Sequence, residues 1–272
     1  MLYSPLLSMF RLLPLTLWVI LCLFAQFVLS TISRKYFFIF YKILFKGIVK
    51  IFGIKVKLDG NIEDKKTLFI SNHISYLDIF ILGSQIDAVF VAKSEIDNWP
   101  IINKICRLGK TIFIERDNVL KIKDQMKLIS KEIMSGFNII IFPEGTSSDG
   151  SKVLPFKSSL FGLINTNLKE ELKIQPISIF YEKLDGIPVE KKFRPFFAWF
   201  GNMDLLPHAW QFLGLGISEV KLKLHKTVKP TQFKNRKELA KYCHKIISDQ
   251  ISVYSQSMDV NSKIKLYEFK LL

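Results

Sequence analysis

The chain has 272 residues, enough for one large α/β domain with an appendage but short for two full domains. Its 39 basic and 24 acidic side chains give a formal charge of +15, which suits an anionic partner such as nucleic acid, a membrane surface or an anionic substrate. It carries no zinc finger, aromatic RNA-binding signature or separate basic arm, so we expect no nucleic acid among its partners.

An uncharged apolar stretch lies near the N-terminus, at residues 12–30. As a helix it would be about 28 Å long, close to the thickness of a bilayer's hydrocarbon core. It is long for a signal peptide and has a poor cleavage pattern, so we expect a transmembrane helix. Positive charge is denser after it, at Arg34 and Lys35, than before it, at Arg11. This bias predicts that the following domain is cytoplasmic.

The next segment, residues 36–54, is rich in Phe and Ile and carries Lys42, Lys46 and Lys50 at intervals of four. On a helix these lysines would form one basic stripe, the pattern expected beside anionic lipid. We therefore expect an interfacial helix, with a second membrane span as the alternative. Residues 1–54 then form a membrane anchor with membrane lipids as partners, at the cytoplasmic face of the bacterial inner membrane.

Residues 55–272 alternate short apolar runs with helical patterns, which predicts a mixed, mostly parallel sheet covered by helices, preceded by the membrane-anchoring helical segment. The runs predicted as strands are 67–71, 88–92, 111–115, 138–142 and 176–181. A helix is expected at 118–135, an irregular insert at 183–216, a strand at 220–228 and a closing helix at 236–254.

The first candidate for chemistry is the sequence NHISYLD at residues 72–78, directly after the strand 67–71. A His five residues before an Asp arises by chance in roughly one such sequence in five, so it is weak by itself. Ser75 and Asp78 also fit a capping box at a helix start. The two interpretations are compatible. A carboxylate there can accept the N–H of His73 and raise the basicity of the other ring nitrogen.

Two further strand ends carry polar groups. The sequence FPEGT at residues 142–146 sets a Glu and exposed backbone N–H groups at a strand tip, where open α/β sheets gather their sites. The sequence GKTIFIER at residues 109–116 ends a strand with an Arg that suits an anion. The alternative for FPEGT is an ordinary turn, and the alternative for the Arg is an ordinary surface residue.

With QPISI at residues 175–179, these motifs resemble the glycerolipid acyltransferase family typified by 1-acylglycerol-3-phosphate acyltransferases. The family's motifs are NHxxxxD, a strand ending in Arg, FPEGT and a later strand containing Pro. Here they follow in that order over roughly residues 50–185. The resemblance implies an enzyme that moves a fatty acyl group from acyl-CoA or acyl-carrier protein to the free hydroxyl of 1-acylglycerol-3-phosphate. The product would be phosphatidic acid, in phospholipid biosynthesis.

The resemblance also implies the roles of the site residues. His73 would be the general base and Asp78 would orient it. The residues expected to hold the acceptor's polar head are Arg116, Glu144, Gly145 and Thr146. Because no GxSxG elbow is present, we expect direct transfer without an acyl-enzyme, and neither a metal nor another cofactor is implied.

One departure leaves the acceptor open. Many family members continue FPEGT with Arg-Ser, whereas Ser147-Ser148-Asp149-Gly150 follows here, and Lys157 is the candidate to replace the missing cation. The alternative acceptors are lyso-ornithine lipid, whose amine could meet Asp149, and the lysophospholipids of membrane remodelling. An alternative of another class is a non-catalytic lipid-binding membrane protein. Such a protein would have no chemical reason to keep both His73 and Asp78.

Overall fold

The computed structural model describes residues 3–30, 34–98, 102–115, 119–165 and 168–269. Within these ranges the core is an eight-stranded sheet of order β1-β8-β6-β2-β5-β3-β4, with β7 paired to β6 outside that path. The strands are β1 Ile54–Asp59, β2 Thr67–Ser71, β3 Ala88–Lys93, β4 Ile112–Ile114, β5 Asn138–Ile141, β6 Lys173–Leu184, β7 Ile187–Pro188 and β8 Ser218–Leu224.

The sheet is mixed and mostly parallel, as predicted. β2 runs parallel to both neighbours, β5 and β6, and β3 runs parallel to β5 and β4. β8 is antiparallel to β6 but parallel to the edge strand β1. Every residue of β2 and β5 is buried, which is typical of parallel strands covered on both faces.

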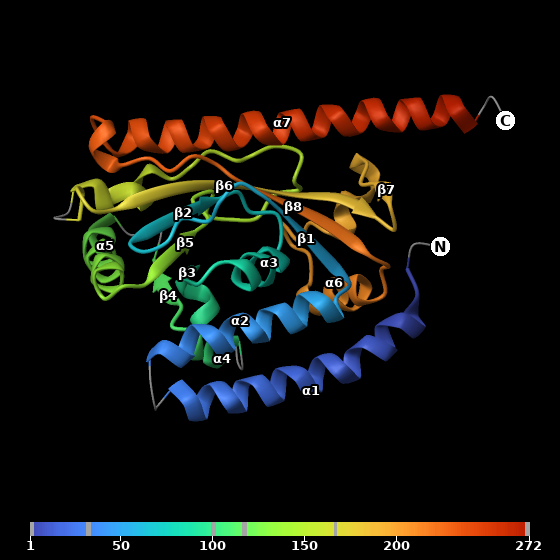
Figure 1. Ribbon diagram of the computed structural model, residues 1–272, viewed down its shortest axis with the longest axis horizontal. Helices are drawn as coiled ribbons and strands as arrows, with labels where there is room; N and C mark the ends of the chain where they lie inside the picture. The colour runs from blue at the N-terminus through green and yellow to red at the C-terminus, as the bar shows by residue number, and fades with distance from the viewer. Residues whose placement is uncertain (1–2, 31–33, 99–101, 116–118, 166–167, 270–272) are drawn as a thin grey trace.

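Helices cover both faces of the sheet (Figure 1). They are α1 Pro5–Ser30, α2 Arg34–Ile51, α3 Leu77–Gln85, α4 Ile102–Leu108, α5 Val119–Met134, α6 Leu205–Leu213 and α7 Arg236–Phe269. Short 3-10 turns add η1 Ser94–Asn98, η2 Ser158–Asn165, η3 Lys191–Phe196 and η4 Pro230–Gln232. One core cluster joins α2 and α3 to one face of the sheet, and a second joins α5, η2 and α7 to the other.

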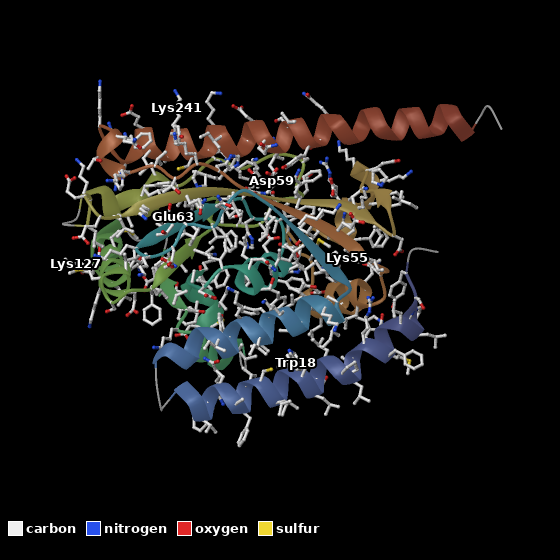
Figure 2. All side chains as sticks on the ribbon, in the orientation of Figure 1. Trp18, Lys55, Asp59, Glu63, Lys127 and Lys241 are labelled. Atoms are coloured by element: carbon white, nitrogen blue, oxygen red, sulfur yellow. The ribbon has the colours of Figure 1, made fainter. Side chains whose placement is uncertain are left out.

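Helix α1 forms an outer layer on the α2 side of the molecule (Figure 1). Trp18, drawn between α1 and α2 in Figure 2, donates from Nε1 to the carbonyl of Leu44 at 3.1 Å. Arg11 donates from Nη1 to the carbonyls of Leu213 and Leu215 at 3.0 and 2.6 Å. The residues that α1 exposes are mainly Leu6, Met9, Phe10, Leu13, Leu17, Ile20, Leu21, Phe24 and Phe27. The helix therefore presents an apolar face along its length and is long and apolar enough to cross a membrane.

Several elements differ from the expected ranges. α1 begins at Pro5 rather than near residue 12, and α7 runs on to Phe269 rather than ending near 254. α2 ends at Ile51 because Ile54 already starts β1, a strand that the sequence pattern did not reveal. The insert 183–216, expected to be irregular, contains β7, η3 and the helix α6.

Candidate active site

The His–Asp pair lies at the connection between β2 and α3. β2 ends at Ser71, and His73 follows in the short connection before α3 begins at Leu77. Asp78, in the first turn of α3, accepts from His73 Nδ1 on Oδ2 at 2.9 Å. The Asp78 side chain is fully buried, whereas 17% of the His73 side chain is exposed. The imidazole is therefore fixed through Nδ1 and remains partly open to a ligand.

The buried carboxylate of Asp78 is held by three further donors. Its Oδ2 accepts the backbone N–H groups of Ile74 and Ser75 at 2.7 and 2.9 Å. Its Oδ1 accepts the hydroxyl of Tyr181 at 2.8 Å. These four hydrogen bonds compensate for the loss of water around a buried negative charge.

The predicted capping box is only half formed. Asp78 reaches back to the N–H groups that precede the helix, as the motif requires. Ser75, however, caps nothing, because the helix starts one residue later than expected, after Tyr76. Among the described residues the hydroxyl of Ser75 has no hydrogen-bond partner. The prediction that Ser75 is the N-cap was therefore wrong, and only the Asp78 half of the capping box is formed.

Tyr181 is a site residue that sequence reasoning missed. It lies in β6, the strand beside β2, and burial together with the negative charge of Asp78 raises its pKa well above the ordinary value. The phenol therefore stays protonated and donates to Asp78. Its one sequence signal is a tyrosine in the mostly apolar segment PISIFY, five residues after the Pro of the last family motif.

Glu144 lies under the catalytic connection rather than at its surface. Its Oε1 accepts the backbone N–H of His73 at 2.7 Å, and its Oε2 accepts that of Leu154 at 2.8 Å. Burial raises the pKa of Glu144 to about 8, with a smaller contribution from Asp78, although the two N–H groups act in the opposite direction. Both oxygens of the carboxyl group are thus engaged inside the protein, where they tie the FPEGT turn to His73.

The ring and backbone of His73 are fixed from two more sides. The ring of Phe142 stacks on the imidazole, with centroids 4.1 Å apart and an interplanar angle of 19°. Ser148 donates its backbone N–H to the carbonyl of His73 at 3.0 Å. The side chain of Asn72 bonds both the N–H and the carbonyl of Ile179, at 2.9 and 3.1 Å, and so fastens the connection to β6.

Of the remaining predicted residues, Gly145, Thr146 and Lys157 lie at the FPEGT turn. Gly145 has a φ of +83°, and a side chain there would meet Lys157 Cε at 2.9 Å, so Lys157 lies directly over the turn. Thr146 is exposed on the same turn. Arg116 lies outside the described residues. The strand that precedes it, β4, is three strands from β2, about 14 Å at the usual spacing.

A groove of about 530 Å³ lies elsewhere, between the end of α2, the end of α3 and the start of β1. Its lining includes Lys46, Lys50 and Lys55 but none of the residues predicted for the site. Among the described residues no group of three or more His, Cys, Asp or Glu side chains is placed to hold a metal ion.

Comparison with known proteins identifies the family. A family model described as Acyltransferase matches residues 53–191, the part of the chain that contains β2, the His73–Asp78 pair and the FPEGT turn. The chain belongs to the acyltransferase family. The predicted family and the predicted class of reaction, acyl transfer to a lysolipid, are both confirmed.

The names of individual relatives contain two different acceptors. The chain is 34% identical over 214 residues to a lyso-ornithine lipid O-acyltransferase of Rhizobium meliloti (strain 1021), which covers 75% of this chain and 73% of the relative. It is 36% identical over 109 residues to a 1-acyl-sn-glycerol-3-phosphate acyltransferase of Neisseria gonorrhoeae, with 40% and 43% covered.

A solved structure shares the fold. The crystal structure of the 1-acyl-sn-glycerophosphate (LPA) acyltransferase PlsC from Thermotoga maritima aligns with a TM-score of 0.66, at 22% identity. The alignment covers 91% of this chain and 94% of that one. The similarity therefore extends over most of both chains and shows a shared fold.

Proposed function

We propose that the protein transfers a fatty acyl group from an acyl thioester to the free hydroxyl of lyso-ornithine lipid. The observation that carries this proposal is the extent of the similarity. Relatives with this activity in their names align over 69–75% of both chains, whereas the 1-acyl-sn-glycerol-3-phosphate acyltransferase of Neisseria gonorrhoeae aligns over 40% of this chain. This reverses the preference for 1-acylglycerol-3-phosphate that the motifs suggested, and that acceptor becomes the second candidate.

The proposed chemistry uses His73 as general base. With Nδ1–H donated to Asp78, Nε2 carries the lone pair that takes the proton of the acceptor hydroxyl. The hydroxyl oxygen attacks the thioester carbonyl and forms the new C–O bond. Collapse of the tetrahedral intermediate breaks the C–S bond, and His73 returns the proton to the departing thiolate. The products are the acylated lipid and free CoA or acyl-carrier protein.

We assign the other motif residues by where their side chains lie. Glu144 would position His73 rather than hold the acceptor, since backbone N–H groups occupy both its oxygens. Thr146 and Lys157, on the exposed side of the turn, would contact polar groups of the substrates. Arg116 keeps the role that the motif implies, a contact with an anionic substrate group.

The proposed location is the cytoplasmic face of the bacterial inner membrane. The exposed apolar face of α1 and the membrane-lipid substrates named for the relatives both support association with a membrane. The excess of basic residues after α1 supports the cytoplasmic side.

The test uses the purified full chain with radiolabelled acyl-CoA or acyl-carrier protein. The acceptors are lyso-ornithine lipid, 1-acylglycerol-3-phosphate and lysophosphatidylcholine. We expect the highest kcat/KM with lyso-ornithine lipid. A clear preference for 1-acylglycerol-3-phosphate would replace the proposal by its second candidate. Absence of thioester cleavage with every acceptor would support the non-catalytic alternative.

The second candidate makes its own prediction. If the acceptor is 1-acylglycerol-3-phosphate, a cation must hold its phosphate, and Arg116 is the motif residue for that task. Arg116→Ala should then lower kcat/KM for this acceptor by about 10- to 150-fold, the equivalent of one charge-assisted contact. An equal loss for acceptors with and without phosphate would point instead to the donor's phosphates.

A further inference from the structure

The loop that follows the FPEGT turn is fixed against the catalytic connection. Ser148 donates its backbone N–H and its hydroxyl to the carbonyl of His73, at 3.0 and 3.3 Å. Gly150 packs on Ile74, where a side chain at residue 150 would meet Ile74 Cγ2 at 3.3 Å. Asp149, between these two contacts, is therefore held beside the backbone of His73 and Ile74.

The carboxylate of Asp149 is oriented by one neighbour. Its Oδ1 accepts both the backbone N–H and the hydroxyl of Ser151, at 2.9 and 2.6 Å. Within the described part of the chain these are its hydrogen bonds, and they leave Oδ2 for a ligand. Burial acts to raise the pKa of Asp149, but the bonds from Ser151 and the charges of Arg194 and Lys191 lower it overall. The side chain is therefore a partly exposed, ionised acid.

The positive charges of two residues of η3, Lys191 and Arg194, act on this acid. Residues three apart lie on the same side of a 3-10 helix, so Lys191 and Arg194 share one side of η3. The segment after η3 joins the same loop, since Ser147 donates its hydroxyl to the carbonyl of Trp199 and Trp199 donates its N–H to Ile74. Arg194 also donates to Ser255 Oγ of α7 at 3.4 Å, so its guanidinium is only loosely held.

We propose that Asp149, Arg194 and Lys191 form a subsite for a zwitterionic amino-acid head, with the ammonium on Asp149 and the carboxylate on Arg194 and Lys191. The inference rests on the proposed function. An ornithine head held through an amide keeps one ammonium and one carboxylate, which matches an acid and two cations whose charges act on it. A phosphate monoester has no ammonium for Asp149, so at this subsite the repulsion of the acid would oppose the attraction of the two cations.

The experiment compares single variants of the full chain, Asp149→Asn and Arg194→Gln. The matched control is Lys192→Gln, which removes one charge from the same helix at an exposed residue paired with Glu190 at 3.1 Å. Each is assayed with lyso-ornithine lipid, with its carboxyl methyl ester and with 1-acylglycerol-3-phosphate. The ratio of kcat/KM for two acceptors within one variant cancels any loss of folded enzyme.

Asp149→Asn should lower kcat/KM for both ornithine acceptors by about 10- to 150-fold, mainly through KM, without lowering it for the phosphate acceptor. Arg194→Gln should lower kcat/KM for lyso-ornithine lipid by a similar factor but have little effect on the methyl ester, which has no carboxylate to bind. Lys192→Gln should change none of the ratios.

The two proposals fail in different ways. Wild-type protein that prefers the phosphate acceptor would overturn the proposed function itself. Wild-type protein that prefers lyso-ornithine lipid, with acceptor ratios in Asp149→Asn and Arg194→Gln equal to those of Lys192→Gln, would overturn the subsite alone. If Arg194→Gln lowered kcat/KM equally for lyso-ornithine lipid and for its methyl ester, Arg194 would not be the residue that contacts the carboxylate.

Discussion

At the scale of single residues, the proposed roles of the site residues separate positioning from proton transfer. His73 keeps one partly exposed ring face, while Asp78, Tyr181 and Glu144 are buried around it and bind its ring, its neighbours or its backbone. Such a shell holds the imidazole in one orientation before a substrate arrives, so little reorganisation is left for the reaction. Substitutions at the base and in the shell should therefore have different kinetic effects.

His73→Ala should abolish the proton transfer without unfolding the protein. Removal of a general base typically lowers kcat by about 10²- to 10⁴-fold. The measurement is release of the thiol from the acyl thioester, with circular dichroism to follow thermal unfolding. His244→Ala, the same truncation on α7, should keep its activity. Near-normal turnover by His73→Ala would show that another group takes the proton.

Tyr181→Phe should move the pH profile as well as the rate. Without the phenol, the negative charge of Asp78 loses one of its four donors and stabilises the imidazolium of His73 more strongly. The acidic limb of the kcat/KM profile should then shift to higher pH, because the base is protonated at a higher pH. Tyr254→Phe, on the other face of the sheet, serves as the control. A lowered rate with an unshifted profile would reduce Tyr181 to a packing role.

Glu144→Gln tests the buried carboxyl through stability. The folded chain holds the proton of Glu144 up to about pH 8, whereas the ordinary pKa is 4.5, so the folded state binds more protons between these values. Stability is therefore highest below this window and falls as pH rises through it. Denaturant unfolding at several pH values should show a flatter decline in Glu144→Gln. Identical slopes in both proteins would mean that Glu144 is ionised throughout.

The sequence predicted the pair His73–Asp78 because both residues belong to one short connection. It could not predict Tyr181, because that contact depends on the register of β6 beside β2, across 103 residues of sequence. Nor could it predict that Glu144 faces inward, since the direction of a side chain in a turn depends on the backbone, here on the positive φ of Gly145. The sequence therefore predicted the chemistry within one short segment but not the contacts between distant strands.

At the scale of secondary structure, α2 packs into the core on one side and is exposed to the surroundings on another. One side supplies Leu44, Phe45, Ile48 and Val49 to the core of the catalytic domain. Lys46 and Lys50 are exposed on another side, whereas Lys42 pairs with Asp87 at 3.1 Å. Two lysines of the predicted stripe of three are therefore exposed and not paired with Asp87.

Reversing those two charges should weaken binding to anionic vesicles. Each Lys near an anionic leaflet contributes about 1 kcal/mol, so Lys46→Glu with Lys50→Glu should lower the partition coefficient by at least about 10-fold. Lys237→Glu with Lys241→Glu is the charge-matched control on α7, across the sheet from α2 (Figure 2). Vesicle sedimentation measures both. An equal loss in the two double variants would mean that total charge, and not α2, governs binding.

Elements with a clear periodic pattern of apolar residues could be predicted from the sequence. Elements whose burial depends on tertiary contacts could not. The buried strands β2, β3, β4 and β5 and the helix α5 lie where their apolar patterns placed them, within two residues. β1 was missed because its exposed lysines continue the basic pattern of α2. α6 was missed because its residues pack among aromatics of the insert and α1, so their burial follows tertiary contacts rather than a helical period.

At the scale of the whole molecule, the site and the apolar surface share one side of the sheet. The core cluster that holds Ile74, Leu77, Phe142 and Tyr181 also contains the buried face of α2, and α1 packs on that helix. α7 covers the opposite face (Figure 1). With α1 on a membrane surface, the core cluster that contains the site would lie on the membrane side of the sheet. This arrangement predicts that the apolar face of α1 matters for substrates in a bilayer and not for substrates in solution.

Replacing Phe10, Leu13 and Leu17 by Ser should separate these two situations. The three side chains are 59–77% exposed, so their loss should leave the packing of α1 on α2 intact. Burying each in lipid stabilises the bound state by about 1.5–3 kcal/mol, so the triple variant should bind vesicles at least a thousand-fold more weakly. Its rate on vesicles that contain the lysolipid should fall accordingly, while its rate on a short-chain, monomeric lysolipid should stay near that of the wild type. A parallel loss on both substrates, with unchanged thermal stability, would show that α1 acts on the catalytic centre directly and not through the membrane.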